Sequence, residues 1–263
     1  MSPVSCLPAE ERGAVLMRAP FRAVIFDLDG VLWDGEPTYH EAFNVVLAPL
    51  GHHITDEEYL QVIGHSVEDA WAWVLRRFAL KEPPGRFYGP YNEAVLQLLE
   101  RPMQPFPGVR ALIEELRRRE LSVGLASASL RQWVDATIRS LGLHDAFDTT
   151  VSASEVERAK PAPDLYLTAA GRLGVPPQSC LAIEDTAPGI ASARAAGMFA
   201  VQIRVASTAL PPLPEADLVI EDYSQFDLSL LEDKTKAYDT ERKAVRPAHP
   251  EVSKDAPPNA SGD

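Results

Sequence analysis

The sequence predicts an α/β protein whose core is a parallel β-sheet between two layers of helices, with an all-helical cap inserted after the first strand. Three observations support this fold class. The apolar segment Val24 to Phe26 has the composition of a fully buried strand. From residue 107 onward, short apolar segments alternate with amphipathic ones, as in parallel sheets. Between these regions, residues 38–101 show helical periodicity and no strand pattern.

Two aspartates stand directly after the first strand. Asp27 follows Phe26, Asp29 lies two residues later, and Gly30 allows the backbone to turn sharply. Ligands of open α/β sheets bind beyond the carboxyl ends of the strands, so Asp27 stands where chemistry usually occurs. Two close carboxylates need a cation or a proton to balance their charge, and a divalent metal ion is the expected partner. Taken alone, the segment would also fit an ordinary turn rich in Asp and Gly.

The cap is assigned to residues 37–102. Its helices are expected at residues 38–50, 56–63, 67–80 and 91–100. Gly51 would end the first of these helices, and Ser66 would begin the third. Because this block lacks strands, we expect a separate small domain that the chain enters and leaves through loops. Trp71 and Trp73 cannot face the same side of a helix, so at least one should belong to the core of the cap.

The core domain is assigned to residues 20–36 and 103–232. Right-handed crossovers between parallel strands should place helices on both faces of the sheet. Residues 1–19 are expected to form an arm without an assigned function, and residues 233–263 a disordered tail. Helices are expected at residues 108–120, 130–141, 164–173 and 188–196, and strands at 121–126, 149–152, 181–184, 200–203 and 218–220.

The composition excludes several classes of protein. With 46% hydrophobic and 24% charged residues, the 263-residue chain is expected to fold into one or two globular domains. No segment is apolar enough to span a bilayer, and the first 20 residues lack the apolar region of a signal peptide. Cys6 and Cys180 do not form a disulfide framework, which favours a cytoplasmic location. A formal net charge of -13 without a basic stripe disfavours nucleic-acid binding.

Further polar residues follow other strands of the predicted sheet. Ser127, with Ala128 and Ser129 after it, would offer a hydroxyl and backbone amides to an anion, although a helix cap by either serine explains this tripeptide as well. Lys160 precedes the residues Pro-Ala-Pro-Asp, whose restricted backbone suits a fixed positive charge.

An acidic pair, Glu184 and Asp185, ends another buried strand. Such a pair favours metal binding over helix capping.

In order and context, four motifs resemble those of the haloacid dehalogenase superfamily of phosphotransferases, whose core is Rossmann-like. They are Asp27 to Leu32, Ser127, Lys160 in Lys-Pro-Ala-Pro-Asp, and Glu184 to Gly189.

The resemblance implies a role for each motif residue. Asp27 would be the nucleophile that forms an aspartyl-phosphate, and Asp29 would act as general acid and then as general base. Ser127, Ala128 and Lys160 would hold the phosphoryl oxygens.

The resemblance also implies Mg²⁺ as the cofactor. The Asp27 carboxylate, the Asp29 carbonyl and Asp185 would bind the ion, with Glu184 as a nearby or direct ligand.

Within the superfamily, the motifs are similar to those of β-phosphoglucomutase-like proteins and of phosphoglycolate phosphatases. Tyr39 takes the place of the mutase's cap-side histidine, and Val67 that of its phosphate-binding arginine. Because a mutase must hold a second phosphate, we expect a phosphatase of small phosphate monoesters, such as sugar phosphates or phosphoglycolate. A hexose-phosphate mutase is the alternative. A non-catalytic binding relative is less favoured because all the motif residues are present.

The cap should supply substrate specificity. His65, Ser66 and Glu68 are the candidate substrate contacts, because the loop before a cap helix can face the core. A small phosphorylated metabolite is the expected partner, and a monomer the expected state.

Overall fold

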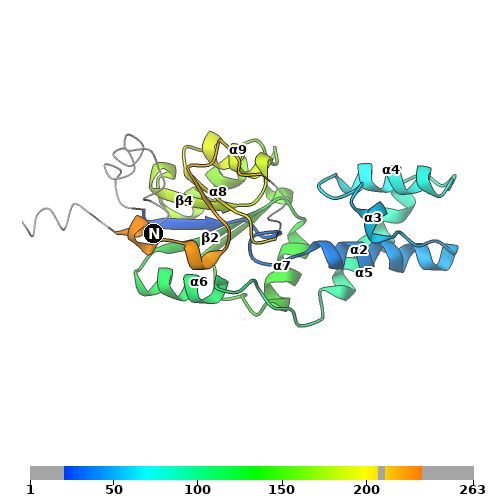
Figure 1. The fold of residues 1–263 in the computed structure, drawn as a ribbon, viewed down its shortest axis with the longest axis horizontal. Coiled ribbons are helices and arrows are strands. Elements are labelled where there is room, and N and C mark those ends of the chain that lie inside the picture. Colours follow the sequence, from blue (N-terminus) through cyan, green and yellow to red (C-terminus); the bar gives the residue numbers. More distant parts are fainter. Residues whose placement is uncertain (1–20, 207–210, 233–263) are drawn as a thin grey trace, which may run out of the picture.

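The protein is described here by a computed structural model, which covers residues 21–206 and 211–232. The arm and the tail expected from the sequence therefore lie outside the described residues. Figure 1 shows a sheet covered by helices and, beside it, a group of helices α2 to α5. Among the described residues, no helix is long and apolar enough to cross a membrane.

All six strands of the sheet are parallel and lie in the order β3-β2-β1-β4-β5-β6. The central strand β1 pairs with β2 on one side and with β4 on the other. The chain thus reverses its direction of travel across the sheet next to β1, and such a switch point is the usual ligand site of an open α/β sheet. The strands are β1 (Ala23–Phe26), β2 (Ser122–Ser127), β3 (Thr149–Ser152), β4 (Cys180–Glu184), β5 (Phe199–Ile203) and β6 (Leu218–Ile220).

Helices cover both faces of the sheet, which confirms the predicted three-layer architecture. Side chains of β1 alternate between the faces, with Val24 and Phe26 in one apolar cluster and Ala23 and Ile25 in the other. Every β-strand and α-helix of the core lies within two residues of its predicted bounds, whereas the short 3-10 helices of the core were not predicted. The helices are α6 (Val109–Arg118) and α7 (Arg131–Ser140) on the first face, and α8 (Asp164–Leu173) and α9 (Ala187–Ala195) on the second.

The inserted block is helical, as predicted, but three of its helices differ from expectation, and one of them, α4, ends three residues before its predicted end. The helix expected at residues 56–63 is shorter and consists of the single turn α3. Leu60 and Ile63, which follow this turn, are exposed, so their side chains do not stabilise a longer helix by burial. Helix α5 begins six residues earlier than expected, and it continues through Pro90, a residue that usually interrupts a helix. Burial of Phe87 and Tyr91 offsets the lost hydrogen bond. The helices are α2 (Glu36–Leu47), α3 (Asp56–Tyr59), α4 (Val67–Arg77) and α5 (Gly85–Leu98).

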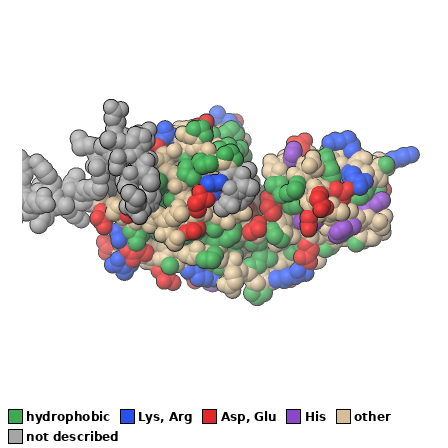
Figure 2. All heavy atoms as spheres, in the orientation of Figure 1, with side chains coloured by type: hydrophobic (Ala, Val, Ile, Leu, Met, Phe, Trp, Pro, Cys, Tyr) green, Lys and Arg blue, Asp and Glu red, His purple; other side chains and the backbone are tan. Residues whose placement is uncertain are grey.

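An aromatic cluster forms the core of this block. Trp71 is fully buried and stacks on Phe87, with ring centroids 4.8 Å apart, and it makes a tilted contact with Phe43 and a T-shaped contact with Tyr91. Trp73 is only half-buried. One tryptophan of the pair therefore belongs to the cap core, as the helical spacing predicted. On the face shown in Figure 2, acidic and basic side chains are interspersed on both the sheet domain and the helical block.

We predict that Trp71→Ala lowers the free energy of unfolding by about 3–5 kcal/mol, because it removes a fully buried ring. Trp73→Ala on the same helix serves as the control and should cost clearly less. Urea unfolding followed by circular dichroism measures both. Equal losses in the two variants would contradict this assignment of the cap core.

Candidate active site

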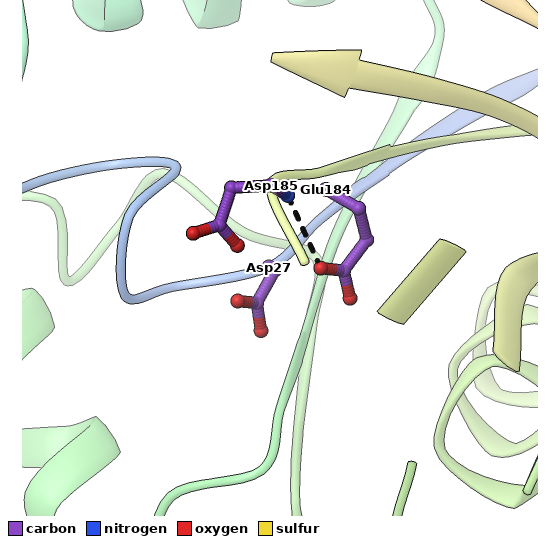
Figure 3. A group of neighbouring side chains, drawn as sticks. All are labelled: Asp27, Glu184 and Asp185. Atoms are coloured by element: carbon purple, nitrogen blue, oxygen red, sulfur yellow. Dashed lines mark hydrogen bonds between the residues drawn. The ribbon is translucent and has the colours of Figure 1, made fainter. Parts of the chain in front are cut away.

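Three carboxylates meet where β1 and β4 end (Figure 3). Asp27 directly follows β1, and its backbone N–H donates to the Ile183 carbonyl at 2.9 Å. Glu184 is the last residue of β4 and Asp185 follows it. Because the two strands are parallel neighbours, their ends bring these side chains together, and their carboxylate oxygens lie within 4.8 Å of one another.

The Lys160 ammonium lies between two of these acids. Its Nζ is 2.6 Å from Asp27 Oδ1 and 2.5 Å from Glu184 Oε1, and the lysine side chain is 6% exposed. Burial opposes the charged ammonium, but attraction to Asp27 and Glu184 outweighs it and raises the pKa of Lys160. The structure thus brings the lysine of the third motif into contact with the first and fourth motifs.

One ammonium does not balance the acids around it. Burial raises the pKa of Asp27 to about 7; Lys160 opposes this shift, and repulsion from Glu184 adds to it. Burial likewise raises the pKa of Asp185 to about 8, with repulsion from Asp27 and Glu184 adding to the shift. A further positive charge at this point would favour the ionised form of both groups.

The described residues fit a divalent cation at this point. Asp185 Oδ1 is buried and has no hydrogen-bond partner, so a carboxylate oxygen is available. Gly30, with a φ of 74°, lets the loop after Asp29 approach so closely that a Cβ there would clash with the Asp185 carboxylate. Carboxylate oxygens are the ligands that Mg²⁺ and Ca²⁺ take from proteins.

Glu184 is held by several hydrogen bonds. Its side chain is fully buried, and Oε1 accepts hydrogen bonds from the Tyr166 hydroxyl at 2.7 Å and from Lys160. The N-cap residue of helix α9 is instead Thr186, whose Oγ1 accepts a hydrogen bond from the Gly189 N–H at 3.2 Å. Helix capping therefore does not explain the acidic pair.

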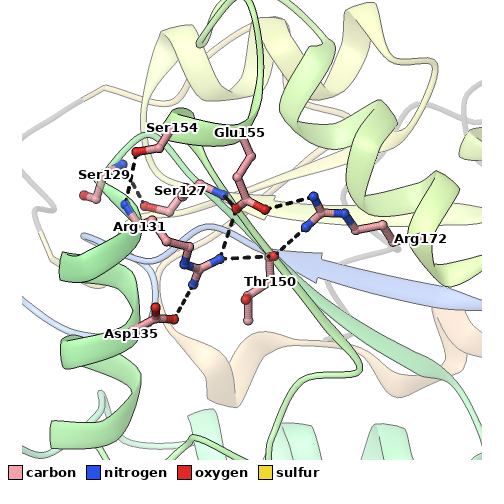
Figure 4. A network of polar contacts seen from close by, with 9 residues as sticks. Ser127, Ser129, Arg131, Asp135, Thr150, Ser154, Glu155 and Arg172 are labelled. Carbon is pink, nitrogen blue, oxygen red and sulfur yellow. Dashed lines mark hydrogen bonds and ion pairs between the residues drawn. The ribbon is translucent and has the colours of Figure 1, made fainter.

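The segment that carries Lys160 is fixed on both sides. After the lysine, the Ala162 carbonyl accepts a hydrogen bond of 2.6 Å from the Ser192 hydroxyl of α9. Before the lysine, the Glu155 carboxylate forms ion pairs with Arg131 at 3.1 Å and with Arg172 at 2.9 Å (Figure 4). These contacts tie the segment to helices on both faces of the sheet, so the ammonium has a defined position.

Asp29 has a partner on each carboxylate oxygen. Tyr39 donates its hydroxyl to Oδ1 at 2.8 Å, and Ser129 donates to Oδ2 at 2.9 Å. Burial raises the pKa of Asp29 in spite of these two hydrogen bonds. No pattern in the sequence indicates a contact between Tyr39 and Asp29, so this role of Tyr39 was not predicted.

Ser127 is linked to this acid through Ser129 and does not cap a helix. The residue is 1% exposed, and its hydroxyl accepts a hydrogen bond of 3.0 Å from the Ser129 N–H. Helix α7 begins after Leu130 without a side-chain cap, so the alternative of a helix cap by either serine is wrong. Ala128 is exposed at the same turn.

Comparison with known proteins gives the family. Residues 21–197 match the haloacid dehalogenase-like hydrolase family. The chain belongs to this family. Fructose-1-phosphate phosphatase YqaB of Escherichia coli (strain K12) is 35% identical over 70% of this chain and 97% of its own length. β-Phosphoglucomutase of Bacillus subtilis (strain 168) is 30% identical over 82% and 96%.

Solved structures agree with the fold. A crystal structure of β-phosphoglucomutase from Clostridium difficile superimposes with a TM-score of 0.65 and 26% identity, covering 84% of this chain and 99% of that chain. The predicted membership of the superfamily, including its β-phosphoglucomutase-like branch, is confirmed, as is the Rossmann-like core. Several relatives carry the names of phosphatases, which are enzymes of the expected class, phosphoric monoester hydrolases.

The candidate cap contacts lie apart from the haloacid dehalogenase motifs. His65, Ser66 and Glu68 are exposed at the start of α4, where Ser66 caps the helix through the Asp69 N–H at 3.1 Å. Within the part of the chain that the structure describes, no hydrogen bond or ion pair joins these three residues to the acidic cluster. Their contact with substrate stays a prediction.

We predict that Mg²⁺ stabilises this hydrolase more at pH 8 than at pH 6. The raised pKa values mean that, without metal, folded Asp27 and Asp185 retain protons that the unfolded chain releases above about pH 4. The stability that these two groups contribute is therefore lost as the pH rises towards 8, and a bound cation replaces the protons.

Thermal unfolding with and without Mg²⁺ measures this effect. Asp185→Asn should lose most of the Mg²⁺-dependent rise in Tm, whereas Asp145→Asn, at an exposed site, should keep it. An undiminished rise in Asp185→Asn would contradict the assignment of the metal ligands.

Proposed function

We propose that this protein is a Mg²⁺-dependent phosphatase that hydrolyses small phosphate monoesters through an aspartyl-phosphate on Asp27. The observation that carries the proposal is the position of the Asp27 carboxylate, at the end of the central strand, in contact with the Lys160 ammonium and close to Asp185. A buried carboxylate in contact with a fixed cation suits attack on an anionic phosphoryl group, because the surrounding charges are arranged before substrate arrives.

In the first step, an Asp27 carboxylate oxygen attacks phosphorus and the bond from phosphorus to the ester oxygen breaks. The departing alkoxide takes the proton of Asp29, so a neutral alcohol leaves and Asp29 becomes a carboxylate. Ser127 and Lys160, with the Ala128 amide, hold the phosphoryl oxygens.

In the second step, water attacks phosphorus of the aspartyl-phosphate. Asp29 takes the proton of that water, the acyl–phosphate bond to Asp27 breaks, and inorganic phosphate leaves. Both aspartates return to their starting protonation states, which closes the cycle.

The cofactor in this proposal is Mg²⁺. Asp27, Asp185 and the Asp29 carbonyl would hold it, with Glu184 close by. When bound, the ion offsets the negative charge of the carboxylates and of the phosphoryl oxygens.

The substrate class follows from the relatives and from the cap. YqaB is named for fructose 1-phosphate, and other relatives as hexitol phosphatase B and as a phosphorylated carbohydrates phosphatase. These names favour a sugar or polyol phosphate over phosphoglycolate. His65, Ser66 and Glu68 remain the proposed substrate contacts from the cap.

A hexose-phosphate mutase is the second candidate, because β-phosphoglucomutases are among the relatives. Val67 disfavours it: its apolar side chain packs against the hydrophobic core of the protein and carries no charge for a second phosphate. Tyr39, at the place of the mutase's histidine, donates its hydroxyl to the Asp29 carboxylate.

We expect Mg²⁺-dependent release of inorganic phosphate from a panel of sugar and polyol phosphates. Asp27→Asn should abolish turnover and stay folded, because Lys160 keeps its ion pair with Glu184. Asp145→Asn is the matched control and should keep full activity.

Product analysis with β-glucose 1-phosphate and a bisphosphate primer separates the candidates. Conversion to glucose 6-phosphate without free phosphate would establish the mutase instead. Ordinary turnover in Asp27→Asn would remove the proposed nucleophile.

A further inference from the structure

We propose that Tyr39 is a positioning residue for Asp29, and that it makes departure of the leaving alcohol depend on contact between the helical cap and the core. The inference rests on the proposed role of Asp29 as general acid. It adds a residue that is outside the four motifs and that belongs to helix α2 of the cap.

Tyr39 determines which oxygen of Asp29 can transfer a proton. Its hydroxyl donates to Oδ1 at 2.8 Å, which leaves Oδ2 on the side of Ser129. The Ser129 N–H in turn donates to the hydroxyl of Ser127, the residue proposed to hold the phosphoryl group. With Oδ1 held by the phenol, Oδ2, which is linked through Ser129 to Ser127, would deliver the proton to the ester oxygen.

Gly35 makes room for this contact. Its φ of -82° and ψ of -21° are open to any residue, so the backbone does not require glycine here. A Cβ at this position would lie 2.6 Å from Asp29 Oδ1 and 2.8 Å from Tyr39 Cε2. A side chain at Gly35 would therefore separate the phenol from the carboxylate, and the absence of one is explained by the Tyr39–Asp29 pair.

The ring of Tyr39 is held by the core. It stacks on Trp133 of α7, with centroids 5.6 Å apart and planes at 28°. Trp133 Nε1 donates to Asn92 Oδ1 of cap helix α5 at 2.8 Å, and Tyr91 of the same helix meets the Trp133 ring edge at 6.0 Å. Two cap helices thus meet on one core tryptophan.

This arrangement connects cap position with acid catalysis. The phenol reaches Asp29 when α2 and α5 are seated on Trp133 of α7, so a cap displaced from α7 would lose the support of the proton donor. An alkyl phosphate needs that proton because an alkoxide is a poor leaving group. An aryl phosphate such as p-nitrophenyl phosphate releases a stable anion and does not need it.

The test compares kcat/KM for these two kinds of ester, since this ratio reports the steps up to the first departure of a leaving group. With Tyr39→Phe we expect a loss of about 10- to 100-fold for the best sugar phosphate of the panel and of less than about threefold for p-nitrophenyl phosphate. The control is Tyr59→Phe, which removes a cap hydroxyl bonded to a different carboxylate, Glu36, at 2.6 Å. Tyr59→Phe should leave unchanged the value of kcat/KM for the sugar phosphate relative to that for p-nitrophenyl phosphate.

Gly35→Ala provides a second, independent variant. It should show the same selective loss, and the double variant Gly35→Ala/Tyr39→Phe should lose no more than either single one, because both break one contact.

Equal losses for the two substrates in Tyr39→Phe, or no loss for either, would overturn the positioning role. Wild-type protein that releases phosphate from neither ester with Mg²⁺ would instead overturn the proposed function on which that role rests.

Discussion

The contact of Lys160 with Asp27 and Glu184 is the interaction on which the site depends. Charges out of water are costly unless they are paired and hydrogen-bonded, and here one ammonium serves two carboxylates at 2.6 and 2.5 Å. Tyr166 completes the arrangement by donating its buried hydroxyl to Glu184. Lys160, Asp27 and Glu184 are thereby each held by at least one partner before any ligand binds, which is the preorganisation that phosphoryl transfer requires.

The topology of the sheet produces this contact. Because β1 lies between β2 and β4, the chain delivers Asp27, Ser127 and Glu184 at neighbouring strand ends, although they are far apart in sequence. The helical block begins a short loop after Asp29, and α2, which starts at Glu36, lies within reach of the acid that it contacts through Tyr39. The fold thus places a residue of the inserted helices beside the proposed site.

Much of this could be predicted from the sequence, and the misses have physical causes. Core strands and helices followed from apolar periodicity, because burial on a sheet imposes it. The start of α5 could not be predicted in this way, because the burial of Phe87 and Tyr91 outweighs the destabilising effect of Pro90 between them. The partners of Asp29 were missed because a side-chain hydrogen bond across 10 or 100 residues has no periodic signal. The reason for a glycine at residue 35 is found only in the structure, where a Cβ would clash with Asp29 and Tyr39.

The most direct test of the account is to locate the phosphoryl group on the protein. Rapid mixing with a substrate and Mg²⁺, acid quenching within one turnover, reduction by borohydride and peptide mass spectrometry would convert an aspartyl-phosphate into homoserine and identify its position. The account predicts homoserine at residue 27. A protein that turns over but carries no modified carboxylate, or carries it at Asp29 or Asp185, would contradict it.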